Sequence, residues 1–193
     1  SVALKDLAVT QGYSPDRGGA IFTSAGLTLE RAVIRDSQAA FGGAVYLNYQ
    51  SSISRTVKFD RAELIDNSAV VSGGAVWITG QNQQINFSIL NSTFRGNSDG
   101  QTGGAIDANL APQAFLAISN STFHDNVATN GDADGNQADA IDFVGVSQNA
   151  KVYIMNSTFV DHPNGVFALR AGTNADVDDN NFVDDGSERV EVR

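Results

Sequence analysis

The sequence predicts an all-β fold made of stacked repeats, and two observations support this prediction. The phrase Gly-Gly-Ala followed by Ile or Val occurs four times, beginning at Gly18, Gly42, Gly73 and Gly103. Self-similarity at a period of about 20 to 50 residues is typical of chains that stack one supersecondary unit on the next. In addition, apolar and polar residues alternate over short runs, which is the period of a β-strand and not of a helix.

Further apolar columns set the register of seven repeats. One column contains Val9, Ile34, Leu64, Phe94, Phe123, Phe159 and Phe182, whose members are 25, 30, 30, 29, 36 and 23 residues apart. Apolar residues also lie five positions, and mostly seven positions, before each member, as Val57 and Phe59 do before Leu64. Gly, Asn, Asp and Ser separate these runs and favour turns. Each repeat is therefore expected to contain short strands joined by turns.

These spacings favour a right-handed parallel β-helix of about seven coils with three short strands per coil, in a single domain that spans residues 1–193. A propeller blade needs four strands and about 40 residues, more than the shortest repeats provide. A leucine-rich repeat needs a Leu/Asn frame and a helical arm, and the sequence shows neither. In a parallel β-helix, equivalent residues stack about 4.7 to 4.9 Å apart.

The repeat motifs resemble those of two groups of bacterial proteins. The run Leu64-Ile65-Asp66-Asn67, followed by Gly73-Gly74-Ala75-Val76, resembles the paired FxxN and GGAI motifs of chlamydial polymorphic membrane proteins. The phrase Asn-Ser-Thr-Phe at 91–94, 120–123 and 156–159 is similar to that of secreted proteins of the pectate-lyase-like superfamily. The resemblance implies a secreted or surface-exposed passenger, adhesin or polysaccharide-active module, located outside the cell or on the bacterial surface. Because no signal peptide is visible and nothing obvious caps either end, we expect a fragment of a larger protein.

Composition and charge restrict the partners. The chain has a net charge of −10, and the excess negative charge lies in its final third. Nucleic-acid binding is disfavoured, because it requires a basic track along the phosphate backbone. The absence of cysteine excludes disulfides and thiolate metal sites, and no apolar run has the length of a membrane span. A polysaccharide or a host or cell-surface protein is the expected partner.

The strands that follow the Gly-Gly-Ala phrases predict a row of outward side chains. Alternation places Ile21, Val45, Val76, Ile106, Ile141 and Val166 inward, and Phe22, Tyr46, Trp77, Asp107, Asp142 and Phe167 outward. Three successive exposed aromatic residues would form a stripe on which sugar rings or a partner protein could lie. Phe22, Tyr46, Trp77 and Asp107 are therefore the candidate ligand-binding residues. The alternative is that the segments 48–56 and 79–84 cover the stripe.

Two carboxylates at the end of this row suggest a second function. Asp107 and Asp142 would lie on adjacent coils, where paired carboxyls can act as acid and base. A calcium-assisted polysaccharide lyase or hydrolase-like enzyme that uses these residues is thus the alternative to a non-catalytic adhesin or passenger module. The Asn-Thr-Asp, Gly-His-Gly and Arg-Ile-Lys groups of polygalacturonase-like enzymes are absent. A spacer rod without a ligand is the third possibility.

The segment after Phe123 predicts a calcium site. Its phrase Asp132-Ala133-Asp134-Gly135-Asn136 resembles the first half of a calcium loop, which supplies hard oxygen ligands around a sharp turn. The expected ligands of Ca²⁺ are Asp132, Asp134, Asn136, Asp139 and Asp142. The alternative is a solvated acidic loop. His124 and His162, the only histidines, are expected at outward or turn positions and outside any catalytic triad.

Overall fold

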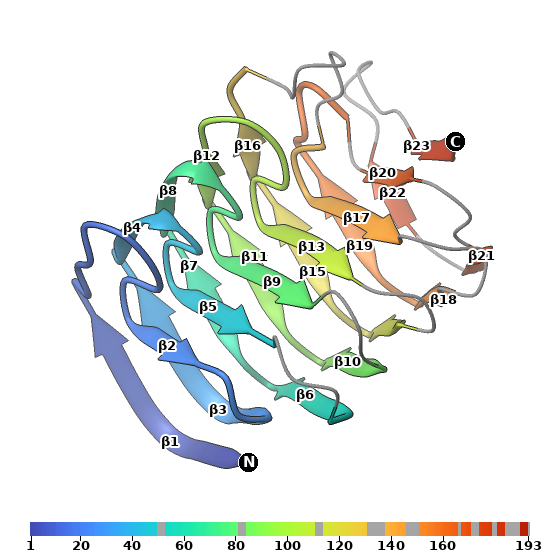
Figure 1. Ribbon diagram of the computed structural model, residues 1–193. Coiled ribbons are helices and arrows are strands. Elements are labelled where there is room, and N and C mark those ends of the chain that lie inside the picture. The colour runs from blue at the N-terminus through green and yellow to red at the C-terminus, as the bar shows by residue number, and fades with distance from the viewer. Residues whose placement is uncertain are drawn as a thin grey trace.

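The computed structural model describes residues 1–49, 53–80, 84–110, 114–130, 138–145, 151–165, 167–170, 174–178, 181–183 and 190–192. These segments contain 23 β-strands and no helix. All strand pairings are parallel, and the strands form three sheets. The chain passes from one sheet to the next and then begins the following repeat (Figure 1).

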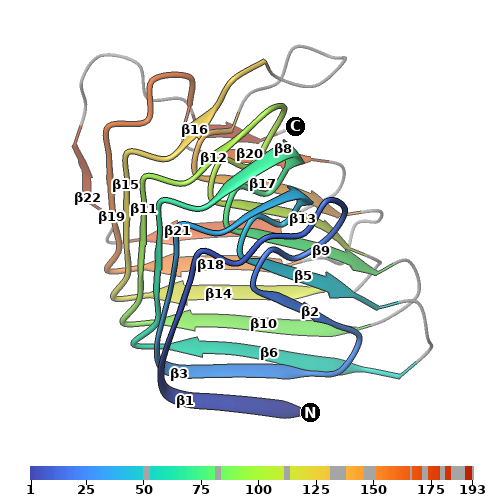
Figure 2. The same cartoon turned by 90° about the vertical axis from the view of Figure 1, so that its left-hand side faces the viewer.

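Sheet A is the largest, with 12 strands, and it joins two rows. The two rows meet in the nine-residue strands β1 and β3, since β3 pairs with β6 through its first half and with β7 through its second half. Figure 2 shows the strands of the first row side by side. The first row is β1 (Val2–Thr10), β3 (Leu27–Arg35), β6 (Arg55–Asp60), β10 (Ile85–Leu90), β14 (Phe115–Ser119), β18 (Lys151–Met155) and β21 (Asn174–Asp178). The second row is β7 (Glu63–Ile65), β11 (Thr93–Arg95), β15 (Thr122–His124), β19 (Thr158–Val160) and β22 (Asn181–Val183).

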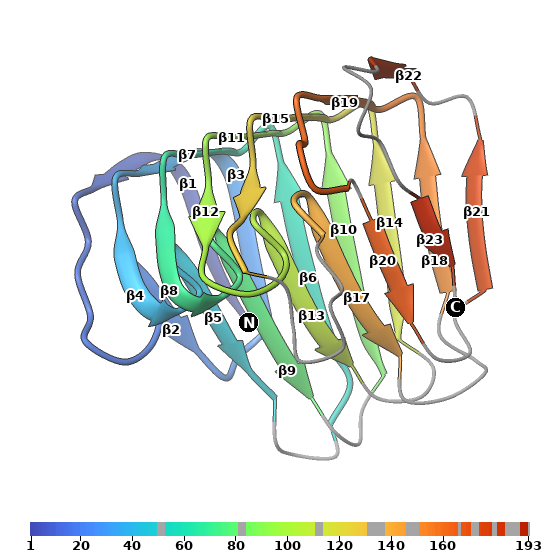
Figure 3. The ribbon, with the colours of Figure 1, turned by 90° about the horizontal axis from the view of Figure 1, so that it is seen from above.

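Sheets B and C complete each repeat. Sheet B has four strands, β4 (Gln38–Phe41), β8 (Ser68–Ser72), β12 (Ser98–Asp99) and β16 (Val127–Ala128), and Figure 3 shows the first three side by side. Sheet C has seven strands. They are β2 (Ile21–Thr23), β5 (Val45–Asn48), β9 (Val76–Gly80), β13 (Ile106–Leu110), β17 (Ile141–Gly145), β20 (Phe167–Arg170) and β23 (Val190–Val192).

The predicted fold class needs correction. We expected a right-handed parallel β-helix, a uniform solenoid of about seven coils with three short strands in each. The described strands instead form three separate parallel sheets of unequal size, with 12, 4 and 7 strands. Two rows merge in sheet A, and sheet B has strands in only four repeats. The cause lies at the turn between the two rows. Asp6 and Arg31 have φ angles of 53° and 49° inside β1 and β3, so each of these strands bends and continues where we expected one short strand to end and the next to begin.

The predicted register of the apolar columns is confirmed. Leu64 pairs with Ile34 on one side and with Phe94 on the other, and Phe123 and Phe159 continue the column to Phe182. One column in sheet C was predicted wrongly. Phe167, expected in the outward row, pairs with the inward residue Ile141, and Ala168 pairs with Asp142. The pairing of strand β20 is therefore offset by one residue from the prediction. Val166 lies outside the described residues.

The core is built from residues of sheets A and C and of the turns beside them, and it consists of stacked columns. Phe94 and Phe123 stack with ring centroids 4.7 Å apart and planes inclined by 3°, and Phe123 and Phe159 stack at 5.0 Å. All three rings are fully buried. Parallel stacking in register places each ring at about the strand spacing from the next, so that the column excludes water along the axis of the stack.

A ladder of buried asparagines connects the same repeats. The side-chain oxygens of Asn67, Asn97 and Asn126 accept hydrogen bonds from the backbone N–H of Ser37, Asn67 and Asn97, respectively, at 3.1 to 3.2 Å. Their Nδ2 groups donate to the carbonyls of Ile34, Leu64 and Phe94. Buried amides of this kind satisfy backbone groups that turn away from the sheets, so the asparagine of each FxxN phrase has a structural role.

The asparagines of the Asn-Ser-Thr-Phe phrase also have a structural explanation. Asn91, Asn120 and Asn156 have φ angles of 52°, 50° and 49°, a left-handed conformation that asparagine adopts more readily than most residues. The serine after each of them stacks as well: Ser121 Oγ accepts from Ser92 N at 3.1 Å. The repeated phrase therefore specifies a tight turn between the two rows of sheet A.

Candidate functional site

The first and second glycines of each Gly-Gly-Ala phrase set where the strands of sheet C begin. Gly42, Gly73 and Gly103 have φ angles of 61°, 68° and 72°, which favour glycine. The following glycine lies against the next repeat, since a Cβ on Gly74 would be 2.1 Å from the carbonyl oxygen of Gly104. Because every strand starts at the same point, equivalent side chains of β2, β5, β9, β13 and β17 lie in register.

This register brings the predicted residues into one row. Phe22 pairs with Tyr46, Tyr46 with Trp77, Trp77 with Asp107, and Asp107 with Asp142. We call Phe22, Tyr46 and Trp77 the aromatic row. Its ring centroids are 5.4 Å apart between Phe22 and Tyr46 and 4.7 Å apart between Tyr46 and Trp77. The rings thus form one continuous apolar stripe across three strands.

Two further side chains join the aromatic row. The Phe41 ring, from β4, lies 4.9 Å from the Trp77 ring. The guanidinium of Arg17 lies over Tyr46, 5.2 Å from the ring centroid, in a cation–π contact. Sequence reasoning missed both residues, because they approach from the segment before β2 and from sheet B. The only signal in the sequence is the position of each just before a Gly-Gly-Ala phrase.

The exposure of the aromatic row differs from the prediction. Phe22 is 55% exposed and Trp77 is half-buried, but only 3% of the Tyr46 surface is exposed. Arg17, Phe22 and Trp77 all contact the Tyr46 ring and cover it. Burial also raises the pKa of the Tyr46 hydroxyl above its ordinary value. Three successive exposed rings are therefore reduced to two accessible ones, separated by a covered tyrosine.

The aromatic row ends in a group of buried carboxyls. Asp107 and Asp142 are both buried, and Asp142 accepts a hydrogen bond from Thr102 Oγ1. A third member, Asp99, comes from β12, and its Oδ2 accepts a hydrogen bond from Gly73 N at 3.0 Å. Its Oδ1 is buried and has no hydrogen-bond partner. We call Asp99, Asp107 and Asp142 the acidic cluster.

The environment of Asp99 strongly favours its neutral form. Burial, followed by the charge of Asp107 and more weakly that of Asp142, raises the pKa of Asp99 to about 9, while backbone hydrogen bonds from Gly73 and Gln101 oppose this shift. The side chain is 3% exposed. At neutral pH, Asp99 is consequently a protonated acid beside two other carboxyls, an arrangement found where a site needs a proton donor.

Sequence reasoning missed Asp99, although the sequence contains a signal for it. Asp99 pairs with Ala128, and the residue at its position one repeat earlier is Ala69, which in turn pairs with Ala39. An aspartate thus occupies a column of buried alanines. Comparing the phrase at 97–99 with the equivalent phrases at 67–69 and 126–128 would have revealed it.

The predicted calcium ligands are not brought together by the described part of the chain. Asp132, Asp134 and Asn136 lie outside the described residues. Asp139 is fully buried, and its Oδ1 accepts hydrogen bonds from Ala128 N at 2.6 Å and from Asn164 Nδ2 at 3.2 Å. Its Oδ2 accepts from Asn164 N. Since both oxygens accept hydrogen bonds from protein donors, Asp139 acts as a structural acceptor, and nothing in the described residues shows calcium binding.

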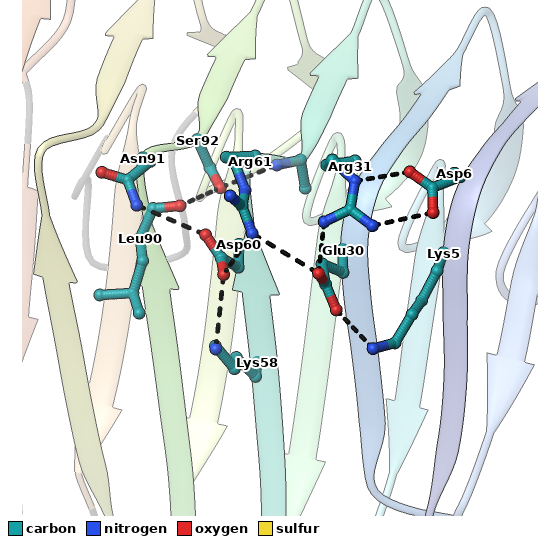
Figure 4. A network of polar contacts seen from close by, with 11 residues as sticks. Lys5, Asp6, Glu30, Arg31, Lys58, Asp60, Arg61, Leu90, Asn91 and Ser92 are labelled. Carbon is teal, nitrogen blue, oxygen red and sulfur yellow. Dashed lines mark hydrogen bonds and ion pairs between the residues drawn. The ribbon is translucent and has the colours of Figure 1, made fainter.

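The charged surface over the first repeats is paired and offers no basic track. The bases Lys5, Arg31, Lys58 and Arg61 each contact an acid from the set Asp6, Glu30 and Asp60 (Figure 4). Arg31 donates to both carboxylate oxygens of Asp6, at 2.5 and 2.8 Å, and this contact lowers the pKa of Asp6. Arg31 and Arg61 thus balance the neighbouring carboxylates of Asp6, Glu30 and Asp60.

Comparisons with known proteins do not assign a family. No family model matches the chain, and neither a curated protein nor a solved structure matches it. Within the described residues there is no helix with the length and apolar character needed to cross a membrane. The predicted extracellular location stays a prediction, and nothing described shows secretion. The functional argument therefore depends on the aromatic row and the acidic cluster.

Proposed function

We propose that this chain is a non-catalytic binding module that holds a glycan on the outer face of sheet C. The observation that carries the proposal is the continuous ring contact of the aromatic row, with Phe22 more than half exposed at one end and Trp77 accessible at the other. The two accessible rings lie at the ends of one packed row, and exposed apolar patches of this kind often mark binding surfaces. The rings are 4.7 to 5.4 Å apart, so they favour an extended ligand that runs across the strands.

The partly exposed Arg17 supports a saccharide rather than a purely apolar partner. Its guanidinium covers Tyr46 and also forms an ion pair with Asp16 at 3.4 Å. Ligand sites combine apolar surface with a few polar groups that fix orientation, and a guanidinium beside accessible rings meets this description. A polysaccharide can place the apolar face of a sugar on Phe22 and direct hydroxyl or carboxylate groups to Arg17.

The test is binding of the pure protein to a panel of immobilised acidic and neutral polysaccharides. Phe22→Ala should weaken retention at least about tenfold, which corresponds to about 1.4 kcal/mol. Tyr13→Ala is the matched control, because Tyr13 is also an exposed aromatic residue but lies outside the aromatic row. Equal retention of Phe22→Ala and the parent protein would overturn the proposal. Binding to cells that survives removal of their glycans would identify a protein partner instead, and no binding at all would favour a spacer.

A second function, cleavage of a polysaccharide, is favoured by one observation, the unpartnered and protonated Asp99. A carboxylic acid that its environment keeps neutral can serve as the acid beside a second carboxyl that serves as the base. Asp99 would donate a proton, and Asp107 would act as the base or nucleophile. The same polysaccharide panel tests this idea through the appearance of new chain ends. Turnover that is lost in Asp107→Asn, while binding persists, would support an enzyme; no new chain ends with any polysaccharide would exclude this function for the panel.

A further inference from the structure

A second group of titratable side chains lies away from sheet C, on the turn between sheets A and B. His124 is the last residue of β15, Asp125 follows it, and Asp161 occupies the equivalent turn one repeat later. Asp125 and Asp161 have φ angles of 52° and 56°, and Asp125 N donates to the carbonyl of Val160 at 3.1 Å. The ladder therefore holds the two aspartates in equivalent conformations on consecutive repeats.

The imidazole of His124 contacts both aspartates. Its Nε2 is 3.0 Å from Asp161 Oδ2, and its Nδ1 is 3.3 Å from Asp125 Oδ2. One ligand atom from each residue lies within 4.8 Å of the other two, and among the described residues this is the only group of three or more with that geometry. All three side chains are partly exposed, so an ion from solution can reach them.

We propose that His124, Asp125 and Asp161 form a surface site for a divalent transition metal such as Zn²⁺. Two ligands bound to one tetrahedral zinc at about 2.0 to 2.1 Å are separated by about 3.3 Å, and the Nε2 of His124 and the Oδ2 of Asp161 are already close to that separation. Nε2 and Asp161 bind the ion directly, and water completes the coordination. The carboxylate of Asp125, whose Oδ2 lies 3.3 Å from Nδ1, favours a proton on that ring nitrogen and so leaves the Nε2 lone pair for the metal.

The ligand types distinguish this site from a calcium site. Ca²⁺ takes six to eight oxygen ligands, whereas imidazole nitrogen combined with carboxylate suits zinc and its neighbours. Of the two histidines in the chain, only His124 is solvent-accessible, because His162 is fully buried. The site is also specific to one junction. His124 stands in a column with Arg95 and Val160, and the position before Arg95 is Ile65. The metal would link two consecutive repeats.

The test is titration of the pure protein with zinc chloride by calorimetry at neutral pH, together with NMR of the two imidazole rings. One equivalent of zinc should bind and should shift the resonances of His124 but not those of buried His162. His124→Val introduces the residue found at the next position of the column and should abolish this binding. Asp161→Asn should weaken it strongly, and Asp125→Asn should weaken it by about 10- to 100-fold. Asparagine is compatible with these turns, since Asn91 and Asn156 adopt the same left-handed conformation.

The matched control is Asp66→Asn. Asp66 is an exposed aspartate on the equivalent left-handed turn of an earlier repeat, but it follows Ile65 instead of histidine. Asp66→Asn should bind zinc as the parent protein does. The proposal is wrong if His124→Val or Asp161→Asn still binds one equivalent with the parent affinity, if Asp66→Asn weakens binding as much as Asp161→Asn, or if zinc leaves the His124 resonances unchanged.

Discussion

The raised pKa of Asp99 predicts a pH dependence of stability that one substitution should remove. Asp99 titrates near 9 in the folded protein and at its ordinary 3.8 in the unfolded chain. Between these values, the folded state retains a proton that the unfolded state releases. The free energy of unfolding therefore falls as the pH rises through this window. This sign is opposite to that of a salt-bridged aspartate, whose contribution grows with pH.

The expected magnitude follows from the proton difference. One proton changes the free energy of unfolding by at most about 1.36 kcal/mol per pH unit, so the interval from pH 5 to pH 8 contributes at most about 4 kcal/mol. Asp99→Asn mimics the protonated side chain, and its amide oxygen can still accept the hydrogen bond from Gly73 N. The new amide N–H₂ replaces the oxygen that has no partner and can donate toward Asp107.

Urea denaturation of the parent protein and of Asp99→Asn at several pH values between 5 and 8 measures this difference. The parent should lose stability toward pH 8, and Asp99→Asn should lose clearly less and be the more stable protein there. Asp66→Asn, which removes an exposed carboxyl on a turn, controls for the change in net charge. If Asp99→Asn and the parent show the same slope, Asp99 is not held in its neutral form, and its assignment as a proton donor fails with it.

Two further predictions concern buried polar residues. Asn97→Ala should lower the free energy of unfolding by about 3 kcal/mol or more in urea denaturation, because Asn67 N loses its acceptor and the Leu64 carbonyl loses its donor. Asn97→Ser places a hydroxyl at this position and should lose less stability. Equal losses in the two variants would contradict this account. Burial lowers the pKa of His162, so the folded state binds fewer protons than the unfolded state, and stability should fall as the pH drops below 6.5. His162→Asn should reduce this loss of stability at acidic pH. An unchanged loss in the variant would show that other groups cause it.

The stacked register was predictable from the sequence because it depends on local alternation repeated at a fixed spacing. A residue such as Phe94 has its ladder partners about 30 positions away, and equivalent apolar residues recur there. The sizes of the sheets were not predictable in the same way. Whether β3 ends at Arg31 or bends there depends on hydrogen bonding across the turn. The spacing of residues in the sequence does not predict this hydrogen bonding.

The sequence predicted which residues of the candidate site lie in one row, but it did not predict which of them are exposed. Alternation correctly placed Phe22, Tyr46 and Trp77 in register, because strand geometry alone determines which residues pair. The exposure of Tyr46 depends on Arg17 and on neighbouring rings, which reach it from other strands and turns. Burial of an outward residue is thus a tertiary property, and the pattern of one strand does not contain it.

The same reasoning explains why Asp99 and His124 are the positions most informative about function. In a stacked repeat, the residues above and below show which side chain is sufficient for folding at each position. Ala128 fills the column of Asp99, and Val160 fills the column of His124. Burial of an aspartate with one unpartnered oxygen costs free energy that alanine would avoid, and the hydrogen bond from Gly73 N to its other oxygen offsets only part of this cost. A polar residue that breaks its own column at such a cost is better explained by chemistry than by stability. Measurements on Asp99→Ala provide the direct check, because this variant restores the alanine column and leaves Gly73 N with the Thr102 carbonyl, 3.4 Å away, as its acceptor. The variant should be more stable than the parent at pH 8, and a loss of stability there would show that Asp99 supports the fold after all.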